Sequence, residues 1–361
     1  MKKMRYILLG AIMMGMCACQ PEYTGWLSQV PDVEEETGKK PIKPTVHEIP
    51  VTRPEEKDLY LEINNRIHEF SWKLFREYYS ASNGNVLIAP FEMSSALHSR
   101  MKKWDNDDQF RLRKVMKLDE YPTEMIENYF YYLNEYYADI SFMQYGVRAR
   151  YKRSYVQESD RFVRTPSFYG LWSSSFDAGE TKRMLFSRAD GTKEEVDMMF
   201  RFSPAYYHEF DSYTVVRVSF GDRNFDSFFI LPNEGYTVDD VIKRISPSDF
   251  LRDNVKRVYL WMPKFNVSQQ NVLDMDVLQK LGFSMADTRA GQADSYAPIW
   301  LDNSLSVAEK GVGEEMLTDT WSSFSPNYST EYRYFHLDRP FIYGILHCHR
   351  NTPLFIGYYG Y

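Results

Sequence analysis

Residues 340–361 read PFIYGILHCHRNTPLFIGYYGY, and this C-terminal stretch decides the fold. Two apolar runs flank the polar segment at 349–353, which indicates two buried strands joined by a turn. Phe341 and Phe355 suit a core, and Gly357 permits the close approach of another part of the chain. These residues specify a fold rather than a catalytic or binding site.

Strand-like segments continue upstream of this hairpin. Residues 212–220 and 226–232 are rich in β-branched and aromatic residues and flank the turn sequence GDRN, so they predict a second strand pair. Residues 257–267 predict one further strand, in which Pro263 indicates a sheet edge or a bulge. Residues 272–283 interrupt these strands with a short helical pattern.

The N-terminal half carries helical patterns instead. Residues 58–80 place apolar side chains at helical spacing, and residues 91–104, 107–118 and 123–137 predict three further helices. A short apolar strand at 85–90 lies among them. Helices come first and strands later, so the sequence predicts an α+β fold with N-terminal helices packed on mixed or antiparallel β-sheets.

The N-terminus has the composition of an export signal, in which three basic residues precede an apolar run too short to span a bilayer. Cys19 follows the small residue Ala18, as in the lipobox of bacterial lipoproteins. We therefore expect residues 1–18 to be a lipoprotein signal peptide and Cys19 to be lipidated. An ordinary secretory signal is the alternative.

Residues 19–58 are rich in proline and charge and poor in apolar side chains. Such a segment cannot bury enough surface to offset the entropy of ordering, so we expect a tether. The globular domain is then expected at 59–361. This organisation predicts an exported protein held by a lipid anchor at a bacterial membrane, at the outer membrane or cell surface.

Charge and cysteine content exclude several function classes. The net charge of −7 leaves no basic face for phosphate backbones, so we expect no nucleic-acid partner. Loss of Cys17 with the signal and lipidation of Cys19 would leave only Cys348, so we expect no disulfide. On a strand, His347 and His349 share one face and Cys348 the other, so this motif predicts no metal site. We also expect no cofactor.

Several segments, in the same order along the chain, resemble motifs of the serpin family. The resemblance extends from about residue 63 to the C-terminus and implies a serpin-like fold with an exposed reactive loop. The segments that carry it are NVLIAPFEMSSAL (85–97), LWSSSFDAGETKRMLFSRADGTKEEVDMM (171–199), FILPNE (229–234), VYLWMPKFNVS (258–268), LQKLGFSMAD (278–287), FHLDRPFIYGI (335–345) and PLFIGYYGY (353–361).

In serpins, the segment that aligns with residues 307–318 leads into the reactive loop, which a protease attacks as a substrate. The cut loop then inserts as a new central strand of a β-sheet and carries the covalently bound protease with it. Glu309 and Gly311 match the glutamate and glycine of the family hinge. The resemblance implies a hinge made of Glu309, Lys310, Gly311, Val312, Gly313 and Glu314.

The loop departs from the family pattern beyond Gly311. Inhibitory serpins carry small residues where this chain has Glu314, Glu315, Met316 and Leu317. Because strand side chains alternate between faces, insertion would bury Glu314, which is costly unless a buried partner or protonation compensates. Two hypotheses stay open: a loop-inserting inhibitor of serine or cysteine endopeptidases, and a non-inhibitory serpin-fold binding protein whose loop cannot insert.

Serpins also line the opening seam of the sheet with polar residues that act as a latch. The corresponding positions here are Ala89, Glu92, Arg164 and about Leu301, so the usual latch is absent. A Glu92–Arg164 ion pair is the candidate replacement. The stretch between Asn85 and Trp172 is shorter than in the family, which predicts that one or two helices and strands are missing.

The resemblance does not fix the bond that a protease cuts. Counting forward from the hinge and backward from the RPF motif gives two different positions. Aromatic side chains in the loop suit the pockets of chymotrypsin-like and papain-like proteases. We expect a monomer that is not itself an enzyme. The candidate loop residues are Phe324, Ser325, Tyr328, Ser329 and Thr330.

Overall fold

The computed structural model describes residues 54–138, 149–158, 161–221, 224–285, 296–313, 331–348 and 351–361. By its internal contacts the chain divides into Met1–Glu48 and Ile49–Tyr361, and all described residues belong to the second unit. Several predicted features lie outside the described residues. These are the signal peptide, the tether up to residue 53, Cys19, His349, Glu314, Phe324, Ser325, Tyr328, Ser329 and Thr330.

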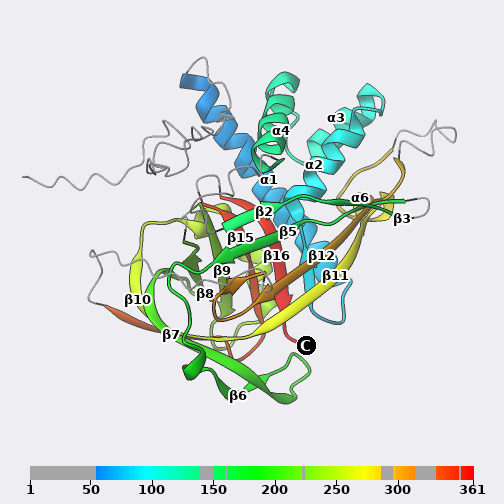
Figure 1. The fold of residues 1–361 in the computed structure, drawn as a ribbon. Coiled ribbons are helices and arrows are strands. Elements are labelled where there is room, and N and C mark those ends of the chain that lie inside the picture. Colours follow the sequence, from blue (N-terminus) through cyan, green and yellow to red (C-terminus); the bar gives the residue numbers. More distant parts are fainter. Residues whose placement is uncertain are drawn as a thin grey trace, which may run out of the picture. The chain divides into compact units, whose positions relative to one another are not determined.

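Helices dominate the first part of the described chain, as the sequence predicted. Figure 1 shows α1 to α4 gathered at the top of the view, above the strands. The helices are α1 (Pro54–Ser80), α2 (Pro90–Met101), α3 (Asn106–Val115), α4 (Thr123–Ala138), α5 (Val238–Arg244) and α6 (Met275–Lys280), with 3-10 turns η2 (Ala178–Glu180) and η3 (Pro247–Phe250).

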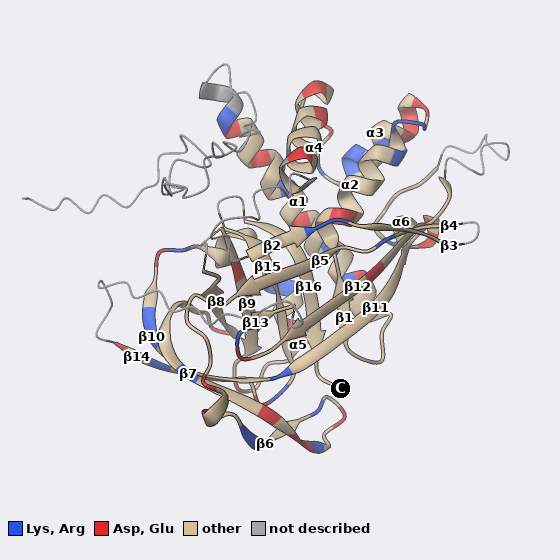
Figure 2. Cartoon of the chain, viewed as in Figure 1, with Lys and Arg blue, Asp and Glu red and all other residues tan. Residues whose placement is uncertain are grey.

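Local chemistry sets the helix boundaries. α1 starts at Pro54, so residues 54–58 are helical, whereas the sequence assigned them to the tether; proline suits a first helical turn because its missing N–H needs no partner there. The side chain of Asp105 accepts a hydrogen bond from the backbone N–H of Asp108 and caps α3. Charges of both signs are interspersed on the helices (Figure 2). Among the described residues, no helix is both long and apolar enough to cross a bilayer.

The larger sheet, which we call the nine-stranded sheet, contains the C-terminal hairpin. Its strand order is β1-β16-β15-β9-β8-β7-β10-β14, with β6 paired to β7. The predicted hairpin is confirmed, because β15 and β16 pair antiparallel, and so is the predicted pairing of β8 with β9. The strands are β1 (Val86–Ile88), β6 (Lys182–Ser187), β7 (Lys193–Glu209), β8 (Tyr213–Ser219), β9 (Phe225–Pro232), β10 (Val255–Pro263), β14 (Tyr332–His336), β15 (Phe341–His347) and β16 (Thr352–Tyr359).

The smaller sheet holds the segment that resembles the hinge. Its strand order is β2-β5-β13-β12-β4-β3, with β11 paired to β12. We call it the seven-stranded sheet. Its strands are β2 (Ala149–Lys152), β3 (Tyr155–Glu158), β4 (Arg161–Arg164), β5 (Ser167–Leu171), β11 (Phe265–Leu273), β12 (Ile299–Val307) and β13 (Gly311–Val312).

Pro263 corrects one prediction about the strands. Residues 257–267 were expected to form one strand at a sheet edge or bulge, but β10 ends at Pro263 and β11 begins at Phe265 in the other sheet. Proline has no N–H to continue a ladder, and the backbone N–H of Lys264 bonds to the carbonyl of Asp197 at 2.8 Å. The chain therefore turns a corner between the two sheets at this point.

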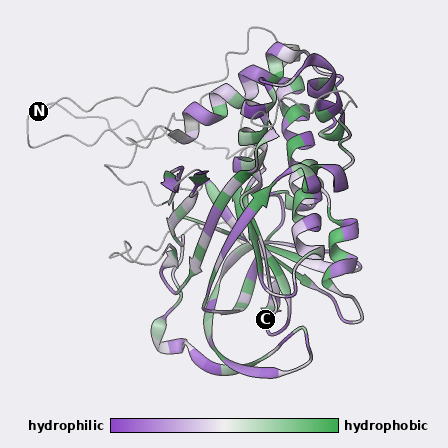
Figure 3. Cartoon of the chain, turned by 90° about the vertical axis from the view of Figure 1, so that its right-hand side faces the viewer, coloured by the Kyte–Doolittle hydropathy of each residue, from purple (hydrophilic) through white to green (hydrophobic). Residues whose placement is uncertain are grey.

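The two sheets and the helices share one hydrophobic core. Strands in the middle of the molecule are largely hydrophobic (Figure 3), and α1 and α2 pack against β16. Gly357 allows the ring of Tyr343 to lie over the backbone, because a Cβ there would come within 2.3 Å of that ring. The α+β class predicted from the sequence is confirmed.

Candidate functional site

The chain reverses direction at residues 308–311, directly after β12. The N–H of Gly311 bonds to the carbonyl of Ala308 at 3.2 Å, which closes a tight turn with Glu309 and Lys310 at its tip. β12 therefore ends at this turn, and β13 leaves it in the opposite direction, antiparallel to β12. Of the predicted hinge residues, Glu309 and Lys310 form the turn, and Gly311 and Val312 pair within the seven-stranded sheet.

Glu309 ties the turn to neighbouring elements. Its carboxylate lies 3.2 Å from Nζ of Lys264 and accepts a hydrogen bond from Oγ1 of Thr181 at 3.1 Å. Partial burial raises the pKa of Glu309, but bonds to its own backbone N–H, to Lys264 and to Thr181 outweigh it and lower the pKa below its ordinary value. Glu309 is therefore an anion at neutral pH.

Three consecutive carbonyl groups of the turn are held from one side. The carbonyl of Ala308 accepts from the indole Nε1 of Trp172 at 2.9 Å, and the carbonyl of Lys310 accepts from the backbone N–H of Trp172 at 3.0 Å. The N–H of Phe176 bonds to the carbonyl of Glu309 at 2.9 Å. Trp172 is fully buried and stacks on Phe220, so the turn is fastened to rigid core.

β13 lies as a short strand between β12 and β5. Val312 pairs with Val307 of β12 on one side and with Gly170 of β5 on the other. Its side chain is fully buried. The start of the implied reactive loop has therefore already entered the sheet by two residues.

Gly313 ends this short insertion. Its φ is +80°, a backbone conformation that favours glycine, and its N–H bonds to the carbonyl of Ser306 at 2.9 Å. A Cβ at this position would lie 2.4 Å from the carbonyl oxygen of Phe168. Only glycine fits this turn without strain, so the residue marks where the chain stops following the sheet.

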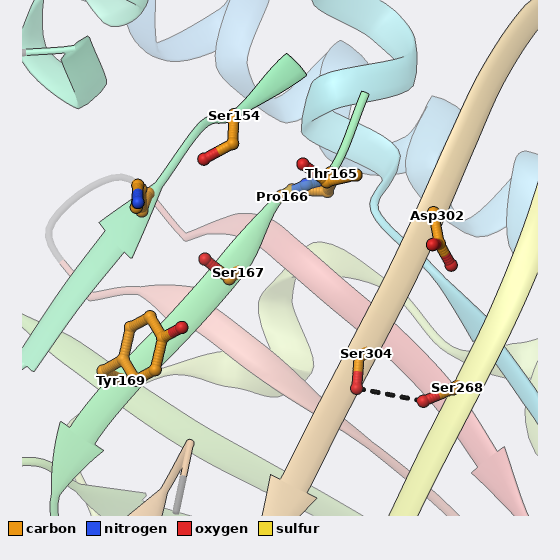
Figure 4. A pocket seen from close by; sticks show the side chains of 9 residues that line it. Ser154, Thr165, Pro166, Ser167, Tyr169, Ser268, Asp302 and Ser304 are labelled. Carbon is orange, nitrogen blue, oxygen red and sulfur yellow. Dashed lines mark hydrogen bonds between the residues drawn. The ribbon is translucent and has the colours of Figure 1, made fainter. Parts of the chain in front are cut away.

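A groove of about 400 Å³ lies between β5 and β12, beyond the end of β13. Figure 4 shows Ser167 and Tyr169 on one wall, from β5, and Asp302 and Ser304 on the other, from β12. In the described strands, β12 pairs toward β5 only at its two ends, with β4 and with β13. The edge between Asp302 and Leu305 therefore faces the groove. The remaining lining residues are Lys152, Ser154, Thr165, Pro166 and Ser268.

The end of the groove away from β13 is closed by β4. Val163 and Arg164 pair in parallel with Trp300 and Leu301 of β12, and Pro166 then separates β4 from β5. Proline lacks the N–H that a continued ladder needs, so β5 diverges from β12 beyond this point. The seam between β12 and its neighbour is thus closed at both ends and open in between.

An ion cluster stands beside the closed end. The buried carboxylate of Glu92, on α2, accepts from Nη1 of Arg164 at 2.8 Å and from Nε and Nη2 of Arg153 at 2.5 and 3.1 Å. Arg153 also donates to Asn134 and Ser95. We call these residues the Glu92 cluster. It connects α2 and α4 to β4 and to the segment between β2 and β3.

Charge pairing in this cluster outweighs burial. Burial lowers the pKa of Arg153, but the neighbouring Glu92 carboxylate raises it more, so the pKa lies above its ordinary value. A carboxylate bonded by two guanidinium groups is among the stronger ionic arrangements in proteins. The cluster can therefore resist movement of β4 relative to α2.

The structure brings some of the predicted latch residues together and not others. Glu92 and Arg164 meet, as the alignment predicted, whereas Ala89 lies at the N-terminus of α2 without a side-chain hydrogen bond. Leu301 is buried and contributes only a strand pair to the seam. Arg153 was missed, because nothing in its local sequence shows which acid it reaches. Lys264 belongs to a motif that the sequence analysis quoted, but its pairing with Glu309 was not foreseen.

His347 and Cys348, which the sequence analysis singled out, do not line the groove. The described residues contain no group of three His, Cys, Asp or Glu side chains that could hold a metal ion. His347 packs against the rings of Tyr137 and Phe225, and burial raises the pKa of the Cys348 thiol well above its ordinary value. The groove, in contrast, offers strand edges that a further strand could complete.

Comparison with known proteins identifies relatives of this fold. A family model described as Serpin (serine protease inhibitor) matches residues 156–360. The chain is 25% identical to Serpin-Z10 of Arabidopsis thaliana over 53% of its own length and 54% of that protein. It is 20% identical to an uncharacterized serpin-like protein of Methanosarcina mazei, over 78% of this chain and 73% of that one.

Solved structures show the same architecture. The native state of the thermophilic serpin tengpin matches with a TM-score of 0.66 at 17% identity, covering 86% of this chain and 96% of tengpin. At that identity the likeness concerns the fold. The chain spans about half the length of most of the curated relatives that it matches.

Proposed function

Because this chain belongs to the serpin family, we propose that it inhibits serine or cysteine endopeptidases by inserting its cut loop into the seven-stranded sheet. The protease nucleophile attacks a peptide carbonyl carbon in the loop, the C–N bond breaks, and the new amino group leaves with a proton. The N-terminal part of the loop, still bound to the protease as an ester or thioester, then enters the sheet. In this mechanism the chain is first the substrate of the protease and then holds it in a covalent complex; the chain itself is not the enzyme.

One observation carries this proposal: β13 already lies between β5 and β12, at one end of an open groove. β13 could be extended along the groove without changing the strand order of the sheet, because β5 and β12 both continue beside the groove. Strand edges at Asp302–Leu305 and at Ser167 would then gain partners. Completed pairing and newly buried apolar surface supply the driving force.

The alternative hypothesis, a fold that no longer inserts its loop, also has a specific observation in its favour. Extending the register of β13 by two residues would set Glu314 opposite Leu305 and Phe168, both of which are buried and apolar. Burying a carboxylate there without a partner would cost several kcal/mol. Glu315 would instead face the polar groove, next to Ser304 and Ser167.

We further propose that the chain acts as a monomer held at a bacterial membrane. The support is the sequence alone: an N-terminal signal, Cys19 in a lipobox-like context, and a proline-rich tether. A tether would keep the domain clear of the surface, where a protease can reach the loop.

The experiment that tests inhibition mixes the full chain, kept in detergent, with chymotrypsin-, elastase-, trypsin- and papain-like proteases. An SDS-stable covalent complex with one of them is the expected result. Clean cleavage in the loop by every protease that cuts it, without a complex, would refute inhibition.

A Glu314→Ala variant then separates the two hypotheses. If the buried carboxylate blocks insertion, this variant forms a complex where the natural chain is only cut. If both chains form it, the carboxylate is accommodated in the sheet. Glu315→Ala is the matched control, since the register directs that side chain to the polar groove, and we expect it to behave as the natural chain does.

A further inference from the structure

An array of aromatic side chains covers the outer face at one edge of the nine-stranded sheet. It spans three adjacent strands, β7, β10 and β14, and β14 is the last strand of the order, beside β10 (Figure 2). We call this array the aromatic ladder. Its members are Phe200, Phe202, Tyr259, Trp261, Tyr332 and Tyr334.

The strand registers place the rings in rows. Tyr259 lies opposite Phe202 of β7 and Tyr334 of β14, with ring centroids 4.4 and 4.9 Å apart. In the next row Trp261 lies opposite Phe200, with ring centroids at 4.8 Å. The ladder is therefore a continuous stack across three strands.

Five of these rings face away from the core, and the sixth, Trp261, is partly buried against it. Their neighbours along the strands, such as Val258, Leu260 and Phe335, are buried, and side chains alternate between the faces of a sheet. Tyr334 is 71% exposed, Tyr332 51% and Phe202 41%. Cross-strand pairing of aromatic rings stabilises a sheet edge, but it does not require this much apolar surface in water.

The ladder adjoins the C-terminal end of the implied reactive loop. β14 begins at Tyr332, and Glu331 before it is anchored by Nζ of Lys256 at 2.6 Å and by the N–H of Arg257 at 3.2 Å. An extended residue spans at most about 3.6 Å, so a cut after Ser329 would lie within roughly 11 Å of Tyr332. A protease that engages the loop there is brought close to this edge of the sheet.

We propose that the aromatic ladder is a docking surface for the body of the attacking protease, on the C-terminal side of the cut bond. The partner is an endopeptidase with an apolar surface beside its active-site cleft. Tyr, Trp and Phe are the residue types enriched where interfaces concentrate their binding energy. The inference rests on the proposed function only in that the partner is a protease that attacks the loop.

The test compares rates of loop attack by the chymotrypsin-like and papain-like proteases. The variant is Phe202→Ser with Tyr334→Ser, since Phe202 is far from the loop in sequence and cannot occupy a substrate pocket. The control is Phe110→Ser with Tyr131→Ser, which removes rings that are 50% and 58% exposed on α3 and α4. A synthetic peptide of residues 314–331 serves as a substrate without the ladder.

We expect the ladder variant to be attacked about tenfold more slowly, as for loss of an interface hot spot, and the control within about twofold of the natural chain. The peptide should also be cut more slowly than the natural chain by the protease that shows the effect. Attack on the ladder variant at the natural rate would overturn the inference. A melting curve checks folding, and Tyr334→Ser alone is the milder substitute.

The rate of loop attack also distinguishes the proposed docking surface from the proposed inhibition. The rate of attack reports on the ladder whether the protease ends trapped or released. If the natural chain is cut without a covalent complex and the ladder variant is cut slowly, inhibition is refuted and the docking surface stands. If a complex forms at equal rates with both chains, the docking surface is refuted and inhibition stands.

Discussion

Glu92 is a buried carboxylate that faces two guanidinium groups, from Arg153 and Arg164. Removing the anion would leave two cations close together, one of them almost fully buried, with no charge between them. This one side chain holds β4 and the segment between β2 and β3 to α2. Its role in the fold can therefore be measured without any protease.

A Glu92→Gln substitution is expected to lower the free energy of unfolding by about 3 kcal/mol, because one partner of a buried ionic cluster is lost. Chemical denaturation measures this. Glu158→Gln is the control, since its pair with Arg161 is 2.7 Å long but leaves the side chains 41% and 34% exposed. The control should lose less than about 1 kcal/mol. Equal losses would contradict a special role for the cluster.

The contribution of Glu309 to the free energy of unfolding should depend on pH. Its pKa is lowered in the fold, so its contribution to stability is fully present above the ordinary value of 4.5 and disappears as the pH falls through the lowered pKa. Glu309→Gln should cost about 0.5 kcal/mol at pH 7, since Lys264 is partly exposed. The difference between natural chain and variant in unfolding free energy should close well below pH 4.5. A pH-independent difference would contradict this.

At the scale of elements, the decisive feature is a two-residue strand that stops at a glycine. β13 contributes one buried side chain, Val312, and Gly313 then leaves the sheet at a φ of +80°. An extended strand would accept any residue at this position, whereas the present turn accepts only glycine. Gly313 therefore favours a loop that is partly inserted into the seven-stranded sheet over one that is fully inserted.

Gly313→Ala should destabilise the uncut chain by about 1–3 kcal/mol, from the positive φ and the contact with the Phe168 carbonyl. It should not destabilise a form in which the loop is fully inserted. Thermal melting of uncut and loop-cut chains measures both. Gly235→Ala is the control, because its φ is +84° but its surroundings are open. A loss no larger than in the control would mean that the clash at Gly313 is relieved elsewhere.

Sequence patterns predicted the longer elements but not how they join. Helices α1 to α4 and α6 and the hairpins β8–β9 and β15–β16 follow from patterns within one segment, whereas α5, β2 to β7 and β12 to β14 were not predicted. The corner at Pro263 was missed, because an edge, a bulge and a change of sheet all place a proline at a strand end. β13 has two residues and hence no period to detect.

The candidate site shows the same limit at the level of single contacts. Glu92 and Arg164 could be paired in advance because a family alignment puts both at the seam. Arg153 could not, because its partner depends on how the segment after β2 passes over α2. Sequence predicts which residues lie near a seam, and only packing decides which of them bond.

The whole molecule has an unfilled place in one of its sheets. The groove between β5 and β12 lies between β13 at one end and, at the other, a seam held by two residue pairs and the Glu92 cluster. A chain arranged in this way is more stable once a strand fills the groove, provided that the barrier to opening can be crossed. Whether the sheet can accept Glu314 decides between a loop-inserting inhibitor and a serpin-fold protein whose loop cannot insert.

The most direct test of this account is the melting temperature of the full chain after a single cut within residues 314–330. We predict a large rise relative to the uncut chain, because the freed loop completes the seven-stranded sheet. An unchanged or lower melting temperature would contradict it, since the groove would then remain open after the loop is released.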